Sequence, residues 1–117
     1  MPTSDRPAFA AWDVVVVPIP YADRLAEKRR PALVISSPRL AQLGFIWVAM
    51  ITSADNEPWS CDVSIADVKR AGLPAPSVVR PAKIACIEPA RILRRAGKLD
   101  REAARKVARG IGAFLAR

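Results

Sequence analysis

Short β-type segments, separated by prolines and polar turns, constrain the fold of this chain more than any other feature of its sequence. The first, Asp13 to Pro18, contains four consecutive valines. Their branched Cβ atoms favour an extended backbone and disfavour a helix. Five more strands are predicted from apolar runs and alternation, at Ala32–Ser36, Phe45–Thr52, Ser60–Ile65, Ser77–Arg80 and Lys83–Glu88.

The hydrophobic period changes at Asp100, and a helix is predicted over residues 100–116. Asp100 is a suitable N-cap, and Glu102 suits the positive end of the helix dipole. Apolar residues then recur on one face, at Ala104, Val107, Ala108, Ile111, Phe114 and Leu115. Short strands and one C-terminal helix that packs on the sheet predict a mainly β fold, a small, partly closed SH3-like barrel.

The segments between these elements are predicted to be loops. Residues 1–11 are expected to form a loose N-terminal arm. The charged residues 21–30 are expected to form a functional loop, with a short solvated helix as the alternative. Residues 37–44 form a turn region with room for one helical turn, and Gly72 and Pro74 predict a loop over 67–76.

Length and composition indicate one domain over residues 1–117, with a real core because 51% of residues are hydrophobic. No apolar run is long enough to span a bilayer, and the first residues do not resemble a signal peptide, so we expect a cytoplasmic protein. The net charge of +8 favours a polyanion or an acidic protein partner.

The side-chain inventory excludes several kinds of site. The chain contains no histidine, which removes zinc-finger spacing, catalytic triads and His–His ribonuclease chemistry. The carboxylates do not cluster, Asp55 and Glu57 being the closest pair, so no metal or other cofactor is expected. Cys61 and Cys86 alternate with apolar neighbours and are expected to be buried strand residues.

Two polar sites stand at strand ends. Arg29, Arg30 and Pro31 precede the strand that ends at Ser36, and Thr52 and Ser53 end the apolar run that begins at Phe45. Strand ends that are distant in sequence can converge in a small barrel. Since the arginine fork matches phosphate geometry and a hydroxyl can donate to a second phosphate oxygen, the pair suits chemistry on a phosphodiester.

These residues resemble the MazF/PemK (Kid-type) toxin family of type II toxin–antitoxin systems, over Trp12 to about Leu115. The resemblance is carried by several runs in order and at fitting separations. They are Asp13-Val14-Val15-Val16-Val17-Pro18, Arg29-Arg30-Pro31-Ala32-Leu33-Val34-Ile35-Ser36, Ile51-Thr52-Ser53, Ala71-Gly72-Leu73, Pro76-Ser77-Val78-Val79-Arg80, Lys83-Ile84 and the terminal helix.

The resemblance implies a metal-independent, sequence-selective endoribonuclease. Arg30 and Thr52 occupy the positions of the family's catalytic residues. The expected reaction on single-stranded RNA is attack by the ribose 2′-hydroxyl, which leaves a 2′,3′-cyclic phosphate and a 5′-hydroxyl. The resemblance also implies a homodimer and a cognate antitoxin whose acidic tail fills the RNA groove, with DNA contacted only through that antitoxin.

Further residues are candidates for the RNA-binding surface. Lys28, Arg29, Arg80 and Lys83 are candidates for backbone contacts, with solvated surface charge as the alternative. Ser53 and Ser77 either contact phosphate or support turns, Tyr21 and Trp59 are candidates to stack on unpaired bases, and Trp12 and Trp47 are expected in the core or a dimer interface. Because arginine stays protonated, the general base is expected to be Glu27, Asp23 or water.

The chain also departs from the family pattern. Trp12-Asp13 stands where many relatives have Gly-Asp, and Lys83-Ile84-Ala85-Cys86 stands where the best-known members have Gln-Ile-Arg-Thr. Base preference is therefore not transferred to this chain. The alternatives are a non-catalytic SH3-like module that binds nucleic acid or protein, and a CcdB-type gyrase inhibitor.

Overall fold

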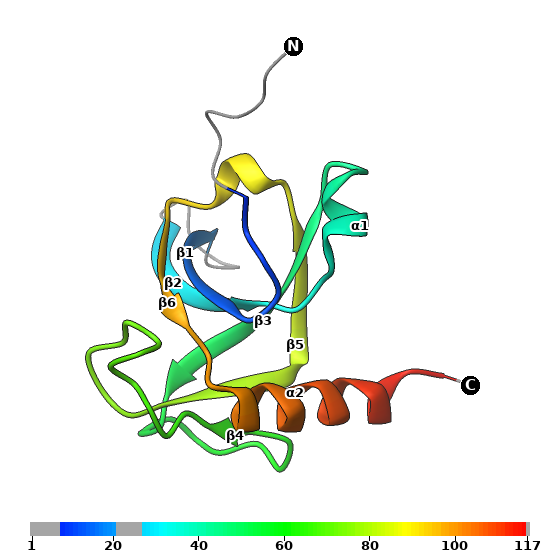
Figure 1. Cartoon of the computed structure of the whole chain (residues 1–117). Helices are drawn as coiled ribbons and strands as arrows, with labels where there is room; N and C mark the ends of the chain where they lie inside the picture. The colour runs from blue at the N-terminus through cyan, green and yellow to red at the C-terminus, as the bar shows by residue number, and fades with distance from the viewer. Residues whose placement is uncertain (1–7, 21–26, 117) are drawn as a thin grey trace.

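The computed structural model describes residues 8–20 and 27–116. Six strands form one antiparallel sheet in the order β4-β5-β3-β2-β1-β6, which curls into a partly closed barrel with a helix across one end (Figure 1). The elements are β1 (Asp13–Pro20), β2 (Glu27–Val34), α1 (Pro38–Ala41), β3 (Ile46–Ser53), β4 (Val63–Ser64), β5 (Ser77–Ile87), the 3-10 turn η1 (Pro89–Arg91), β6 (Arg94–Lys98) and α2 (Arg101–Phe114).

The apolar strands are buried on both faces of the sheet, which explains their continuous hydrophobicity. Val14 and Leu33, which pair across β1 and β2, belong to the cluster that packs under α2. Val15 and Ala32, the next pair, belong to a second cluster on the other face. Successive strand residues point to opposite faces, so each strand serves both clusters.

The C-terminal helix follows the sequence prediction. Asp100 is its N-cap, and the carboxylate accepts a 2.9 Å hydrogen bond from the backbone N–H of Ala103. The buried side chains of α2 are those of Ala103, Ala104 and Val107. The predicted apolar face is wider than the buried one, because Ala108, Phe114 and Leu115 are exposed.

Several strand predictions need correction. Residues 27–30 are not loop but the first half of β2, where their backbone pairs with β1. Ser77–Arg80 and Lys83–Glu88 are one continuous strand, β5, whose register shifts at Pro81, so the proline occupies an irregularity in the ladder. The predicted strand Ser60–Ile65 is reduced to Val63–Ser64.

β6 was not predicted at all. Its sequence, Arg94 to Lys98, contains no β-branched or aromatic residue, and it forms because the backbone pairs with β1 at the edge of the sheet. The helical turn expected within residues 37–44 is α1, which Ser37 caps. Cys86 is exposed rather than buried, and Cys61 is half-buried.

Candidate active site

One pocket brings the two candidate catalytic residues together. Its volume is about 400 Å³, and it lies between the first half of β2, the end of β3 and the loop that precedes β5. Five of the predicted site residues that line this groove come from β2 and β3, and they are Arg30, Thr52, Lys28, Arg29 and Ser53. Ser77 also lines it, at the start of β5.

The strand register explains why Arg30 and Thr52 converge. β2 and β3 are antiparallel neighbours in the sheet, and their ladder ends at the pair formed by Ala32 and Met50. Arg30 and Thr52 each lie two residues beyond that last pair, on neighbouring strands. Both residues line the same groove, which places them on neighbouring strands around one cavity.

A residue that the sequence analysis did not single out fixes the threonine. The Nδ2 of Asn56 donates a 2.5 Å hydrogen bond to Oγ1 of Thr52, and Asn56 also lines the groove. A hydroxyl has one hydrogen to donate. With its oxygen accepting from Asn56, the hydrogen of Thr52 is free to point to a ligand. The sequence feature that could have pointed to Asn56 is the turn-forming run Ser53 to Asn56, because such a turn brings the chain back to the side of Thr52.

The two serines of the groove are engaged in turns. The Oγ of Ser53 accepts a 3.1 Å hydrogen bond from the backbone N–H of Asp55. The Oγ of Ser77 donates at 2.9 Å to the carbonyl of Ala75. Both contacts stabilise the loops that form the rim of the groove, and the predicted phosphate contacts of these serines stay predictions.

Positive charge dominates the described lining. Lys28, Arg29 and Arg30 lie in sequence at the start of β2, and no Asp or Glu side chain lines the groove in the part of the chain that the structure describes. This arrangement favours an anionic ligand. Tyr21 and Asp23 lie outside the described residues, and Glu27 begins β2 next to Lys28.

Three other candidate RNA-binding residues lie outside this groove. The Nε of Arg80 pairs with the Asp62 carboxylate at 3.1 Å, and its guanidinium lies 4.3 Å from the ring centroid of Trp59. Arg80 also donates to the carbonyl of Glu57. These contacts fasten the loop before β4 to β5, so Arg80 and Trp59 have structural partners. Lys83 is exposed on β5.

Metal-binding and membrane-spanning features would indicate other classes of protein. Among the described residues, no group of three or more metal-ligating side chains is gathered in one place. The described part of the chain contains no helix with the length and apolar character needed to cross a membrane.

Residues 10–115 match the family model of the PemK-like, MazF-like toxins of type II toxin–antitoxin systems. The match covers most of the chain, and the chain belongs to this family. The resemblance inferred from the sequence motifs is confirmed. No curated protein sequence matches the chain.

Solved structures agree with this assignment at the level of the fold. The Mycobacterium tuberculosis toxin MazF-mt6 is 24% identical, with a TM-score of 0.68 over 86% of this chain and 93% of that one. MazF in the MazE–MazF complex of Deinococcus radiodurans is 18% identical, with a TM-score of 0.72 over 90% and 94%. A mycobacterial endoribonuclease in complex with its cognate antitoxin is 13% identical, with a TM-score of 0.69 over 91% and 93%.

Proposed function

We propose that this chain is an endoribonuclease toxin that cuts single-stranded RNA without a metal ion. The observation that carries the proposal is the basic groove in which Arg30 and Thr52 lie together. Membership in the toxin family supports it, as does the mycobacterial relative described as an endoribonuclease. In the proposed reaction the ribose 2′-hydroxyl attacks the adjacent phosphorus and the bond to the 5′-oxygen breaks.

Arg30 is proposed to stabilise the negative charge that grows on the non-bridging phosphate oxygens. Its planar guanidinium can donate two parallel hydrogen bonds to those oxygens. Removing one such donor from an active site typically lowers the rate by about 10²–10³-fold. Because a guanidinium is a poor proton acceptor, Arg30 is not proposed as the general base.

Thr52 is proposed to donate a hydrogen bond to the same phosphate, with Asn56 as a positioning residue. The Asn56 amide occupies an acceptor site on the threonine oxygen. The hydroxyl hydrogen is then aimed elsewhere, and the phosphate is the partner that the groove admits. Such preorganisation matters because a misplacement of about 1 Å can lower a rate by about 10²-fold.

The proton balance requires two further transfers. The 2′-hydroxyl loses a proton to a base, for which the candidates are Glu27, Asp23 and a water molecule. The departing 5′-oxygen gains a proton, and the products are a 2′,3′-cyclic phosphate and a 5′-hydroxyl. Neither step needs a cofactor.

The remaining RNA contacts follow from position. Lys28 and Arg29 immediately precede Arg30 and are proposed to bind neighbouring phosphates. Ser53 and Ser77 are proposed to line the path of the RNA strand. Arg80, Lys83 and Trp59 lie outside the groove and stay predicted contacts for nucleotides that extend beyond it. Tyr21, which lies outside the described residues, also stays a predicted contact.

Two protein partners are proposed. A cognate antitoxin with an acidic segment would cover the basic groove, as supported by the MazE–MazF complex of the Deinococcus relative. A second copy of this chain would cover the apolar side chains that β3, β5 and the end of α2 expose. Trp47 is 48% exposed, Ile84 45% and Phe114 59%. The proposed setting is the cytoplasm, where mRNA is available.

The test is to incubate the purified protein, freed of antitoxin, with a long single-stranded RNA in EDTA and to map the ends of the products. We expect discrete cuts with 5′-hydroxyl termini, and no cut at a site where one 2′-deoxyribose replaces the ribose before the broken bond. Cutting that continues at the deoxyribose would exclude attack by the 2′-hydroxyl. Intact RNA would favour the non-catalytic binding module.

A further inference from the structure

A second concave site lies at the junction of β6 and α2. Its volume is about 350 Å³, and we call it the Trp12 pocket after the aromatic residue that lines it. Four basic side chains line it as well, those of Arg70, Lys98, Arg101 and Arg105. The backbone N–H of Lys98 donates a 3.0 Å hydrogen bond to the carbonyl of Arg70, which holds the loop over 67–73 against β6.

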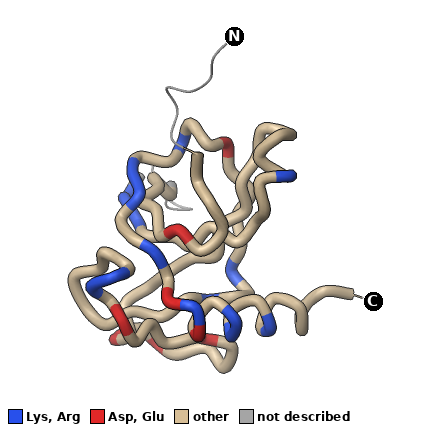
Figure 2. Tube along the Cα trace, viewed as in Figure 1, with Lys and Arg blue, Asp and Glu red and all other residues tan. Residues whose placement is uncertain are grey.

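Three of the four basic side chains of this pocket make no ion pair with a described residue. Lys98 contacts the buried carboxylate of Asp13 at 3.5 Å, but Arg70, Arg101 and Arg105 make no ion pair with any residue that the structure describes. Figure 2 shows basic positions at the end of β6 and along α2, with the acidic residues Asp100 and Glu102 between them at the start of the helix. An anion bound here would find several donors without a competing partner.

Two local electrostatic effects at the start of α2 disfavour these arginines. Arg101 is the first residue of α2, where the helix dipole disfavours a positive charge by about 0.3–1 kcal/mol. Arg101 and Arg105 stand four residues apart, so they repel each other on the helix surface, at about 0.2–0.5 kcal/mol. These two unfavourable electrostatic terms would be offset if the arginines bound an anionic ligand.

Trp12 adds an independent observation. Its backbone has a φ of 75°, in the left-handed region, and it is the single non-glycine residue with positive φ in the described part of the chain. That conformation costs a non-glycine residue on the order of 1–2 kcal/mol. Hydrogen bonds hold it in place, from the N–H of Trp12 to Val34 at 2.7 Å and from the N–H of Leu99 to Trp12 at 2.9 Å. Strained residues of this kind gather at binding sites.

We propose that the Trp12 pocket is a second nucleotide-binding site, in which a base stacks on the Trp12 indole and its phosphates contact Arg101 and Arg105. The occupant is single-stranded RNA. An acidic peptide would satisfy the arginines but would leave the indole without a matching flat surface, whereas a nucleotide supplies both a phosphate and an aromatic face.

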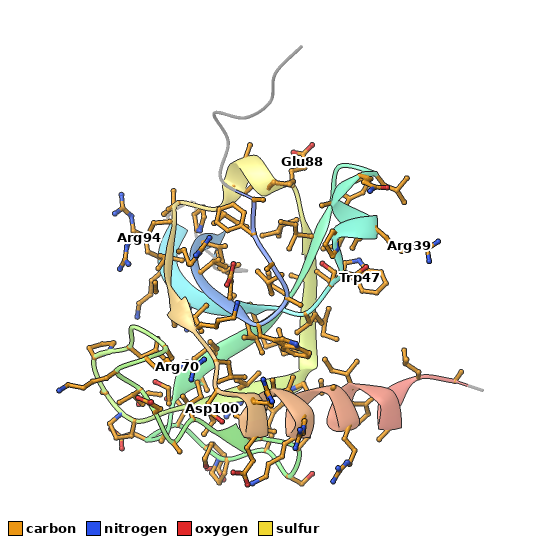
Figure 3. All side chains as sticks on the ribbon, viewed as in Figure 1. Arg39, Trp47, Arg70, Glu88, Arg94 and Asp100 are labelled. Carbon is orange, nitrogen blue, oxygen red and sulfur yellow. The ribbon has the colours of Figure 1, made fainter. Side chains whose placement is uncertain are left out.

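The position of the pocket fits a strand that continues from the cleavage groove. The loop over 67–76 separates the two sites, because Arg70 lines the Trp12 pocket while Leu73 and Pro74 line the groove. Figure 3 marks Arg70 and Asp100 near this junction. The inference rests on the proposed function only in taking the bound RNA to be the substrate of the cleavage groove. Binding of RNA at the Trp12 pocket does not itself require cleavage.

The test compares two double variants on the same helix. Arg101→Ala with Arg105→Ala empties the pocket of two cations. Lys106→Ala with Arg109→Ala removes the same charge from side chains outside it. The probes are RNAs whose riboses are all 2′-O-methylated, so that they resist attack by the 2′-hydroxyl, with lengths of about 4 and about 16 nucleotides.

For the long RNA we expect the pocket variant to raise Kd about tenfold more than the control variant does. The slope of log K against log salt should fall by about 1.4, since each phosphate contact on a single strand contributes about 0.7. The short RNA should bind both variants with similar affinity. A Trp12→Leu variant, checked for folding by urea unfolding, should weaken binding of the long RNA about tenfold through lost stacking.

Three results would overturn the proposal. One is an equal loss for both double variants, which would mean general electrostatic attraction. Another is an unchanged Kd for long RNA in the pocket variant. The third is an acidic peptide that loses affinity in the pocket variant while RNA does not. Cleavage by the wild-type protein is measured separately, so a failure of the proposed catalysis leaves this binding result interpretable.

Discussion

At the scale of single residues, the proposed chemistry of the groove depends on the direction of the hydroxyl hydrogen of Thr52. The oxygen of Thr52 accepts a hydrogen bond from Asn56, so the threonine hydroxyl can donate outward. Arg30 supplies charge and fixed geometry from the neighbouring strand. The residue order predicted an arginine pair and a hydroxyl pair at strand ends, and the family resemblance singled out Arg30 and Thr52 among them. The role of Asn56 depends on how a turn folds back, which local patterns do not specify.

We predict that Asn56→Ala lowers the single-turnover cleavage rate about tenfold, because Thr52 then samples other rotamers. Thr52→Val, which keeps the branched shape and removes the hydroxyl, should lower it by about 10²–10³-fold. The informative comparison is the double variant. If Asn56 acts by positioning Thr52, adding Asn56→Ala to Thr52→Val changes the rate no further. A second full tenfold loss would assign Asn56 a role independent of Thr52.

At the scale of elements, the valine-rich β1 and the capped helix α2 are confirmed because their patterns are strong and local. The errors occur where tertiary pairing overrides propensity. β6 has a polar, glycine-containing sequence and exists because β1 offers an unpaired edge. The first half of β2 is charged and still extends, because β1 pairs with it. Pro81 does not end β5, since the ladder shifts its register there.

A close backbone contact fixes the loop that separates the groove from the Trp12 pocket. Gly72 has a φ of 74°, and a Cβ added to it would lie 2.0 Å from the carbonyl oxygen of Ala96 in β6. We predict that Gly72→Ala lowers the free energy of unfolding by more than the roughly 1–2 kcal/mol of left-handed strain alone. Urea unfolding measures this change.

Gly44→Ala is the matched control for that substitution. Its φ is 95°, but no atom lies within 4 Å of the added Cβ. This variant should therefore show backbone strain without a clash. Equal destabilisation by the two substitutions would mean that the contact between the loop and β6 contributes nothing.

At the scale of the whole molecule, the distribution of surface types separates the roles of the faces. Basic side chains line the groove and the Trp12 pocket, whereas large apolar side chains are exposed on β3, β5 and the end of α2. Trp47 pairs with Cys86, and Ile84 pairs with Ala49, so these side chains share one face of the sheet. Exposed apolar patches of this kind mark interfaces.

We predict that Trp47→Glu shifts a dimer to monomer in sedimentation-velocity measurements, because a charge at the centre of an apolar interface is costly to desolvate. Leu93→Glu is the control, because Leu93 has a similar exposed fraction of 47%. Its backbone N–H donates to the carbonyl of Val16 in β1, so it lies beside β1 and not on β3 or β5. A wild-type protein that sediments as a monomer at all concentrations would contradict the proposed homodimer.

The central claim is that the groove at Arg30 and Thr52 is the catalytic centre. The most direct measurement is the single-turnover rate of RNA cleavage in EDTA by Arg30→Ala. The control is Arg39→Ala, which removes an exposed arginine of α1 that does not line the groove (Figure 3). We predict a rate about 10²–10³-fold below the wild type for Arg30→Ala, with unchanged unfolding, and a wild-type rate for Arg39→Ala. Wild-type cleavage by a folded Arg30→Ala variant would contradict the assignment.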